Sequence, residues 1–206
     1  RMQKVHNATK GKALIHGLGF MRYPTVFQVP VATIDASSMT TGSRFGTVSV
    51  YSKEKGIQQF HWKDLEKKEN ESQLWELLKM GLSINDLKKQ ENYRTSKGIQ
   101  SLSTIASYIE FAQQCEEKNI GLFAALPNSD WILVFAAAYY VMALNNGKLN
   151  YKEAVNTVAA LRENKKNNHE KFFQMLVDIF YKSTNYSIKM LDDTQDITKR
   201  FPVKNS

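Results

Sequence analysis

The stretch IGLFAALPNSDWILVFAAAYYVMAL, residues 120–144, decides the fold class. Ile120 to Ala125 is a short apolar run that follows a helical pattern, which is typical of a buried parallel strand. Leu126 to Asp130 contains Pro, Asn and Ser and predicts a turn. Trp131 to Asn145 is apolar on almost every side, so we expect a helix that is buried all round. A strand that leads into a buried helix indicates a mixed α/β domain.

Upstream of this unit the sequence predicts several strands. Val26 to Ile34 is rich in β-branched residues, and Pro30 indicates a sheet edge or a bulge there. Gly46 to Tyr51 alternates apolar and polar residues, and after a turn Ile57 to Trp62 forms the second strand of the pair. Leu82 to Leu87 is a further short strand candidate.

Apolar residues at helical spacing predict four more helices. One follows a capping pattern at Asn70 and ends at Gly81, and the next runs from Ser103 to Lys118. A third begins at a capping pattern at Asn150, and the last covers Asn168 to Lys182. The element order predicts an α/β fold with a central, mostly parallel sheet, helices on both faces and a three-helix C-terminal segment.

Composition fits one domain with extensions. Of the 206 residues, 42% are hydrophobic and 23% charged, which is close to an average globular protein. We expect a basic lead-in over residues 1–24, a single α/β domain over 25–182 and a polar tail over 183–206. Because Cys115 is the single cysteine, a reducing, cytoplasmic compartment is the simpler interpretation. The sequence starts at Arg1, so we expect a processed product or a fragment, from which a targeting segment can have been removed.

The net charge of +8 favours acidic partners such as nucleic acid, anionic lipid or phosphorylated protein. A solvated lysine-rich surface explains the same excess more simply, since no long basic stripe with interleaved aromatic residues occurs. No apolar run reaches the length of about 20 residues that a membrane span needs. The four histidines show no metal-ligand spacing, and no cofactor or metal is predicted.

Four patterns between residues 74 and 182 resemble the cysteine-based phosphatases of the tyrosine and dual-specificity class. They are the helix end Glu76 to Gly81, the loop Asn92 to Thr95 before the helix around Tyr108, the unit Ile120 to Leu144, and the helices with Leu149 to Val155, Leu161-Arg162 and His169 to Phe173. The resemblance implies a phosphatase-like fold. It also implies a phosphate loop, with a nucleophilic Cys and a phosphate-gripping Arg, between the strand and the buried helix.

At these positions the chain departs from the phosphatase pattern. Ala124 stands where the resemblance places the nucleophile, and Asp130 stands where it places the arginine. Asn92 occupies the position of the acid, and an amide cannot protonate a leaving group. The resemblance therefore implies no catalytic residues and a degenerate phosphate loop. We expect a pseudoenzyme that serves as an interaction module for an acidic or phosphorylated protein partner.

Three loop arginines, Arg22, Arg44 and Arg94, are candidate partner-binding residues. A nucleic-acid-binding or anionic-membrane-binding domain is the alternative function, supported by charge alone. A second alternative is an enzyme of another class that uses His61 or His16 with an acid that the sequence does not identify. His16 opens a Gly-x-Gly segment, but the strand and helix that flank a nucleotide-binding loop are not predicted there.

Overall fold

The protein is described here from a computed structural model, which describes residues 2–9, 12–36, 39, 46–83, 85, 99–124, 126 and 129–182. Its α-helices are α1 (Met2–Ala8), α2 (Glu71–Lys79), α5 (Ile99–Glu117), α6 (Ser129–Leu144), α7 (Tyr151–Asn167) and α8 (His169–Lys182). Its strands are β1 (His16–Gly17), β2 (Thr33–Ala36), β3 (Thr47–Ser52), β4 (Gly56–His61) and β5 (Gly121–Ala124). Short 3-10 helices cover Thr25–Phe27, Trp62–Asp64 and Lys68–Asn70.

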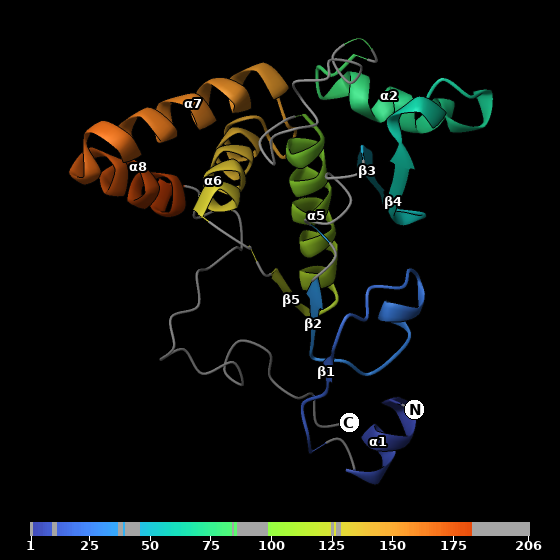
Figure 1. The fold of residues 1–206 in the computed structure, drawn as a ribbon. Coiled ribbons are helices and arrows are strands. Elements are labelled where there is room, and N and C mark those ends of the chain that lie inside the picture. Colours follow the sequence, from blue (N-terminus) through green and yellow to red (C-terminus); the bar gives the residue numbers. More distant parts are fainter. Residues whose placement is uncertain are drawn as a thin grey trace.

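The described strands form two separate sheets (Figure 1). A small parallel sheet has the order β1-β2-β5, with Thr33 beside His16 on one side and beside Gly121 on the other. The second sheet is the antiparallel hairpin β3–β4, in which Tyr51 is paired with Ile57. The fold is therefore mixed α/β with a small parallel sheet, which confirms the fold class in its coarse form.

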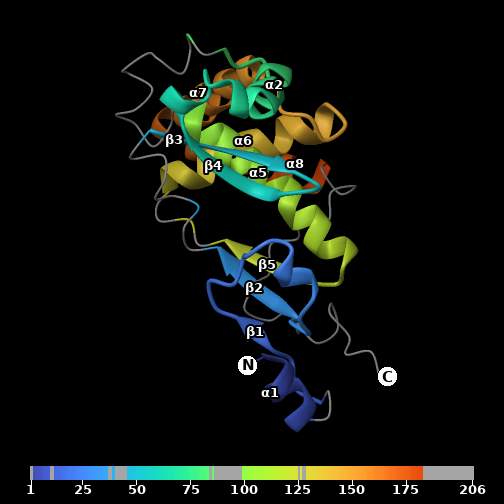
Figure 2. The same cartoon turned by 90° about the vertical axis from the view of Figure 1, so that its right-hand side faces the viewer.

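Helix α5 connects the two sheets, because it packs along the hairpin and also against β5 (Figure 2). Where it crosses β3 the contact is made by hydroxyl groups. Thr104 Oγ1 donates to Ser49 Oγ at 3.2 Å, and Ser107 Oγ donates to the carbonyl of Ser49 at 3.0 Å. Each hydroxyl is buried with a partner, so this polar seam carries little desolvation cost.

The main core lies between the hairpin, α5 and the C-terminal helices. Helix α6 is buried on nearly all sides, with Trp131 and Tyr139 almost fully enclosed, and it packs against α5, α7 and α8. The all-round apolar sequence predicts this placement, although Leu144 at the helix end is largely exposed. A second, smaller core joins β2 to α5 and the segment after β1 through Ile34, Phe111 and their neighbours.

Most element predictions are confirmed within the described residues. The hairpin, the parallel strand β5 and helices α2, α5, α6, α7 and α8 lie within a few residues of their predicted bounds. Asn150 caps α7 as expected, because its side chain accepts a hydrogen bond from the Glu153 N–H. The capping box at Asn70 is wrong in detail, since the Asn70 side chain donates to the Asp64 carbonyl and makes no cap bond.

Two predictions near the N-terminus need correction. The strand expected over Val26 to Ile34 begins only at Thr33, and Thr25–Phe27 forms a 3-10 helix after Pro24. Pro30 lacks an N–H and cannot join a ladder, so the strand starts after it. The expected lead-in over residues 1–24 contains α1 and β1. β1 is too short for a periodicity signal, and it is a strand because it pairs with β2.

Candidate functional site

Several of the site residues expected from the sequence fall outside the described part of the chain. Asn92, Arg44 and Arg94 are among those residues, and so are positions 125, 127 and 128 of the expected phosphate loop. Ala124 is described as the exposed last residue of β5, and Asp130 lies in the first turn of α6. Arg22 is exposed in the loop after β1. The described residues therefore do not test whether these positions converge.

Cys115 and His61 take ordinary structural places. Cys115 is buried in the smaller core, and burial raises the pKa of its thiol to about 12, so the sulfur stays protonated at neutral pH. His61 ends β4, and its Nδ1 accepts a hydrogen bond from the Lys63 N–H at 3.3 Å. Asp64 is an acidic neighbour of His61, since Lys67 and, less strongly, His61 lower the pKa of its carboxyl.

The parallel sheet has two faces of different chemistry. Ile34, Ala36 and Leu122 point toward the cores that contain α5 residues. Because side chains alternate along a strand, Thr33 and Asp35 of β2 point to the opposite side. His16 is in register with Thr33, and Phe123 is in register with Asp35. We call the side with His16, Thr33, Asp35 and Phe123 the His16 face, and the other side the α5 face.

His16 is held from both ring nitrogens on this face. Its Nδ1 lies 2.9 Å from the Thr33 hydroxyl, and its Nε2 lies 3.7 Å from Asp35 Oδ1. The ring also meets Phe123 edge to face, with centroids 6.4 Å apart. The neutral tautomer that satisfies both neighbours accepts the Thr33 O–H at Nδ1 and points Nε2–H toward the Asp35 carboxylate. The two strands thus fix the orientation of this imidazole.

Asp35 is positioned by the Gly-x-Gly turn that follows β1. The backbone N–H of Gly19 donates to Asp35 Oδ1. Gly19 has φ +61°, a left-handed conformation that glycine adopts without strain. Both the Gly19 and the His16 contacts use Oδ1, so among the described contacts Oδ2 is left for a substrate.

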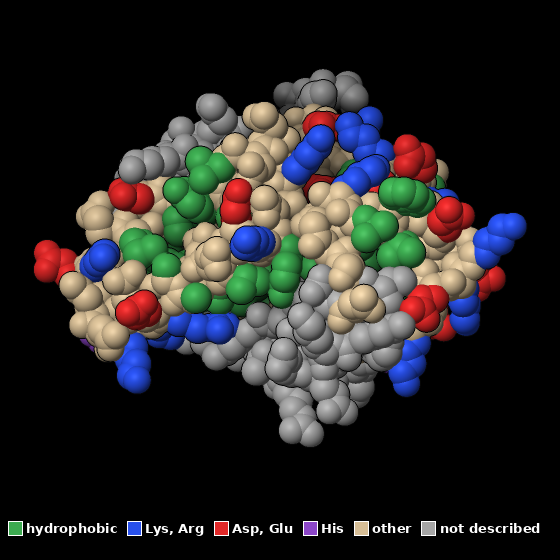
Figure 3. Space-filling model, turned by 90° about the horizontal axis from the view of Figure 1, so that it is seen from above, with side chains coloured by type: hydrophobic (Ala, Val, Ile, Leu, Met, Phe, Trp, Pro, Cys, Tyr) green, Lys and Arg blue, Asp and Glu red, His purple; other side chains and the backbone are tan. Residues whose placement is uncertain are grey.

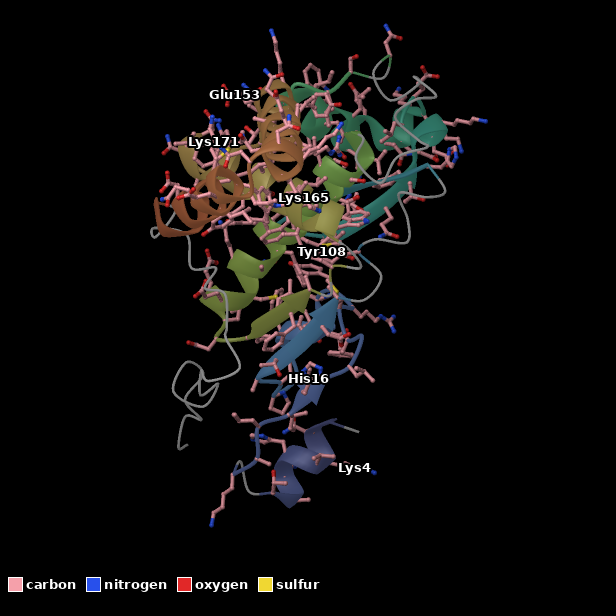
Figure 4. All side chains as sticks on the ribbon, turned by 60° about the vertical axis from the view of Figure 1, so that its left-hand side comes forward. Lys4, His16, Tyr108, Glu153, Lys165 and Lys171 are labelled. Atoms are coloured by element: carbon pink, nitrogen blue, oxygen red, sulfur yellow. The ribbon has the colours of Figure 1, made fainter. Side chains whose placement is uncertain are left out.

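The site is open to solvent on the His16 face of the sheet. The side chain of His16 is 45% exposed and that of Asp35 is 23% exposed, so a ligand can reach both groups. Leu18, between the two glycines, is 84% exposed beside them. Figure 4 shows His16 in the part of the molecule that holds β1, β2 and α1, away from helices α6 to α8.

Sequence reasoning named His16 without its acid. In the sequence, Asp35 is only a carboxylate before two serines, which a turn cap explains more simply than a catalytic site does. The missing information was the pairing of β1 with β2, because this pairing places residues 19 positions apart on one face. A polar residue at the end of each of two short apolar segments, His16 after Ile15 and Asp35 after Ile34, is the signal that could have found the pair.

Charges elsewhere on the described surface are mixed. On the face seen in Figure 3, lysine and arginine side chains are interspersed with acidic ones. Asp64–Lys67 and Glu76–Lys79 form ion pairs of 2.8 Å on the surface. Within the described ranges, no three His, Cys, Asp or Glu side chains gather in a way that could hold a metal ion.

No protein-family model, no curated protein and no solved structure matches this chain. Among the helices in the described ranges, none is long and apolar enough to cross a membrane. The interpretation of the site therefore rests on its own geometry.

Proposed function

We propose that the chain contributes to an enzyme that uses Asp35 and His16 for general acid–base catalysis. The observation that carries this proposal is the position of His16 between the Thr33 hydroxyl and the Asp35 carboxylate, on an accessible face of the sheet formed by β1 and β2. An imidazole oriented by a third group and paired with a carboxylate is the arrangement from which such enzymes take and return protons.

The two groups have different roles in this proposal. Asp35, fixed through Oδ1 by the Gly19 amide, accepts a proton from the substrate at Oδ2. His16, in its protonated form, donates the Nε2 proton to the departing or newly charged atom. The 3.7 Å between Nε2 and Oδ1 is too long for a direct hydrogen bond, so a substrate atom that approaches from the solvent side can bridge the two groups. The substrate is a small molecule that carries an exchangeable proton.

Turnover of a panel of chromogenic esters, amides, glycosides and phosphoesters tests this function. Asp35→Asn and His16→Asn should each lower kcat by roughly 10²- to 10⁴-fold while the fold is retained. Asp64→Asn and His169→Asn are matched controls, because both residues are exposed and remote from the His16 face, and they should leave the rate unchanged. Full activity in Asp35→Asn, or no turnover by the unmodified protein of any panel member, would contradict the proposal.

An inactive phosphatase-like interaction module is the second candidate function. It is supported by the parallel strand β5 and the all-round buried helix α6 that follows it, which is the order that the resemblance implies. With Ala124 and Asp130 at the key positions, this module binds an acidic or phosphorylated partner without cleaving it. Binding of a phosphotyrosine peptide that exceeds binding of its unphosphorylated form, with no release of phosphate, supports it. RNA binding at low salt that is lost steeply as the salt concentration rises would favour a nucleic-acid role.

A further inference from the structure

The turn that joins α6 to α7 contains Asn146-Gly147, the only Asn-Gly pair in the sequence. In such a pair the backbone nitrogen of the glycine can attack the side-chain carbonyl carbon of the asparagine, because glycine has no Cβ to hinder the approach. The new C–N bond displaces the side-chain nitrogen as ammonia and closes a succinimide ring. Water then opens the ring to aspartate or isoaspartate. The net reaction consumes a water molecule and releases ammonia, with no oxidation or reduction.

The C-terminal cap of α6 holds this pair in an unreactive conformation. The Gly147 N–H donates to the Met142 carbonyl at 2.7 Å, and the Lys148 N–H donates to the Asn145 carbonyl at 3.1 Å. Asn146 has φ +52°, the left-handed conformation in which many helices end. The glycine nitrogen must lose its proton to become the nucleophile, and here a carbonyl holds that proton. The closed cap therefore blocks the first step of the reaction.

The side chain of Asn145 ties the cap to the next helix. Its Nδ2 donates to the Val141 carbonyl at 3.0 Å and to Glu153 Oε2 at 2.8 Å. Glu153 belongs to the first turn of α7, and Figure 4 shows it at the top of the molecule. A single amide group thus connects the last turn of α6 to the first turn of α7, and its removal should loosen the turn without touching the core.

The turn can open while the two helices stay packed. Met142 and Leu149, on either side of it, are 0% and 3% exposed and belong to the main core. Between them Asn146 and Lys148 are exposed, and Leu144 is 63% exposed. Local opening costs least where few buried apolar contacts are lost. The turn therefore opens more readily than the helices that flank it.

We propose that Asn146 is a deamidation site controlled by the α6 cap, which reacts when the cap is open and is protected when the cap is closed. The product weakens the cap further. Isoaspartate adds a methylene group to the backbone, and either product places a carboxylate at the negative end of the α6 dipole. The modification therefore accumulates in one direction and records how often the turn opens. It is independent of the proposed catalytic pair, which lies on the His16 face of the parallel sheet.

Peptide mapping by mass spectrometry, with fragment ions that locate the change at Asn146, tests the proposal. The chain unfolded in guanidinium chloride should deamidate there roughly 10- to 100-fold faster than the folded protein at the same pH and temperature. Asn145→Ala should raise the rate of the folded protein by roughly 3- to 10-fold, because it removes both side-chain bonds that hold the turn. Asn164→Ala is the matched control and should leave the rate unchanged, since Asn164 Nδ2 bonds the Ala160 carbonyl and the Met175 sulfur far from this turn.

Hydrogen exchange at the Gly147 amide gives a second readout that needs no variant. The cap should slow this exchange and the deamidation of Asn146 by similar factors, since both require the bond to Met142 to open. Asn146→Gly keeps a residue that suits the left-handed turn and should abolish the modification. The proposal is overturned if the folded and unfolded proteins deamidate at equal rates, or if position 146 stays unmodified in the unfolded chain. It is also overturned if Asn145→Ala keeps the fold and the rate of the unmodified protein.

Discussion

The two faces of the parallel sheet are built from alternate residues of the same short strands, and they differ in almost every property. On the α5 face, Ile34 and Ala36 are fully enclosed by apolar neighbours. On the His16 face, Asp35 and His16 are accessible, and His16 is within hydrogen-bond distance of Thr33 and 3.7 Å from the Asp35 carboxylate. One side therefore supplies stability through burial, while the other is free to carry polar groups, because the strand itself is already held in place.

A comparison of two carboxylates makes the same point. Asp35 on the His16 face has a backbone amide and an imidazole beside it. Glu110 lies on α5 one turn from Ser107 and Gln114, which bond to the hairpin. Burial, and to a lesser extent the charge of Glu76, raises the pKa of Glu110 to about 7. A carboxylate that is buried, like Glu110, lowers stability when it is ionised. A carboxylate that solvent can reach, like Asp35, is less affected by desolvation.

The largest expected effect comes from breaking the α5 face. Ile34→Ala should lower the free energy of unfolding by about 2–5 kcal/mol, because it removes fully buried apolar contacts and leaves a cavity. Urea unfolding followed by circular dichroism measures this loss. Leu18→Ala is the control on an exposed leucine beside the His16 face, and it should change stability by less than about 0.5 kcal/mol. Equal losses in the two variants would remove the distinction between the faces.

The pH dependence of Glu110 gives the next largest effect. Its pKa is raised in the folded state from 4.5 to about 7, so the folded protein holds this proton more tightly than the unfolded chain. The contribution of Glu110 to stability is therefore present below pH 4.5 and is lost as the pH rises through about 7. Relative to Glu110→Gln, the unmodified protein should lose roughly 1–3 kcal/mol across this window.

Urea unfolding of both proteins at several pH values measures this difference, since the other titrating groups are shared and cancel. A stability difference between the unmodified protein and Glu110→Gln that stays constant from pH 4.5 to 8 would show that Glu110 titrates normally.

A smaller effect is expected at the turn that positions Asp35. Gly19→Ala should cost roughly 1–2 kcal/mol, because alanine is strained at φ +61° although the space around the position is open. Gly19→Asn should recover part of this loss, since asparagine tolerates the left-handed region better than alanine does. Thermal unfolding ranks the three proteins. If Gly19→Ala is as stable as the unmodified protein, residue 19 does not hold the left-handed conformation described above.

The smallest effect is expected at Thr33, the residue that precedes Ile34 in the sequence. Thr33→Val keeps the shape of the side chain but removes the hydroxyl that meets His16 Nδ1 at 2.9 Å. We expect a loss of about 0.5–1 kcal/mol, less than for Ile34→Ala one residue away. Histidine NMR should show faster motion of the His16 ring. An unchanged His16 signal would mean that Thr33 does not orient the imidazole.

The helical half of the molecule could be predicted from the sequence because its signals are local. The apolar residues 131–144 specify a buried helix wherever it packs, and the Asn150 cap marks the start of α7 through one side-chain bond. The hairpin β3–β4 could be predicted equally well, because apolar and polar residues alternate in the strands on either side of a turn that ends at Gly56. In each case the pattern lies inside the element that it defines or within a few residues of its ends.

The candidate site could not be predicted, because it depends on pairing between distant segments. β1 has only two residues and forms because β2 lies beside it, so no pattern within residues 1–24 predicts it. His16 and Asp35 become neighbours through that pairing. The expected strand over 26–34 placed the start of β2 too early, which hid that Thr33 and Asp35 share a face.

The hydroxyl seam between α5 and β3 has a mechanical consequence. Thr104 and Ser107 both bind Ser49, and these two contacts stop α5 at one axial position along β3. This stop sets Tyr108 and Phe111 at the height of Ile57. The hydroxyl groups of Thr104 and Ser107 thus determine which residues of α5 lie opposite β4, and so where the hollow lined by Tyr108, Phe111 and Ile57 opens.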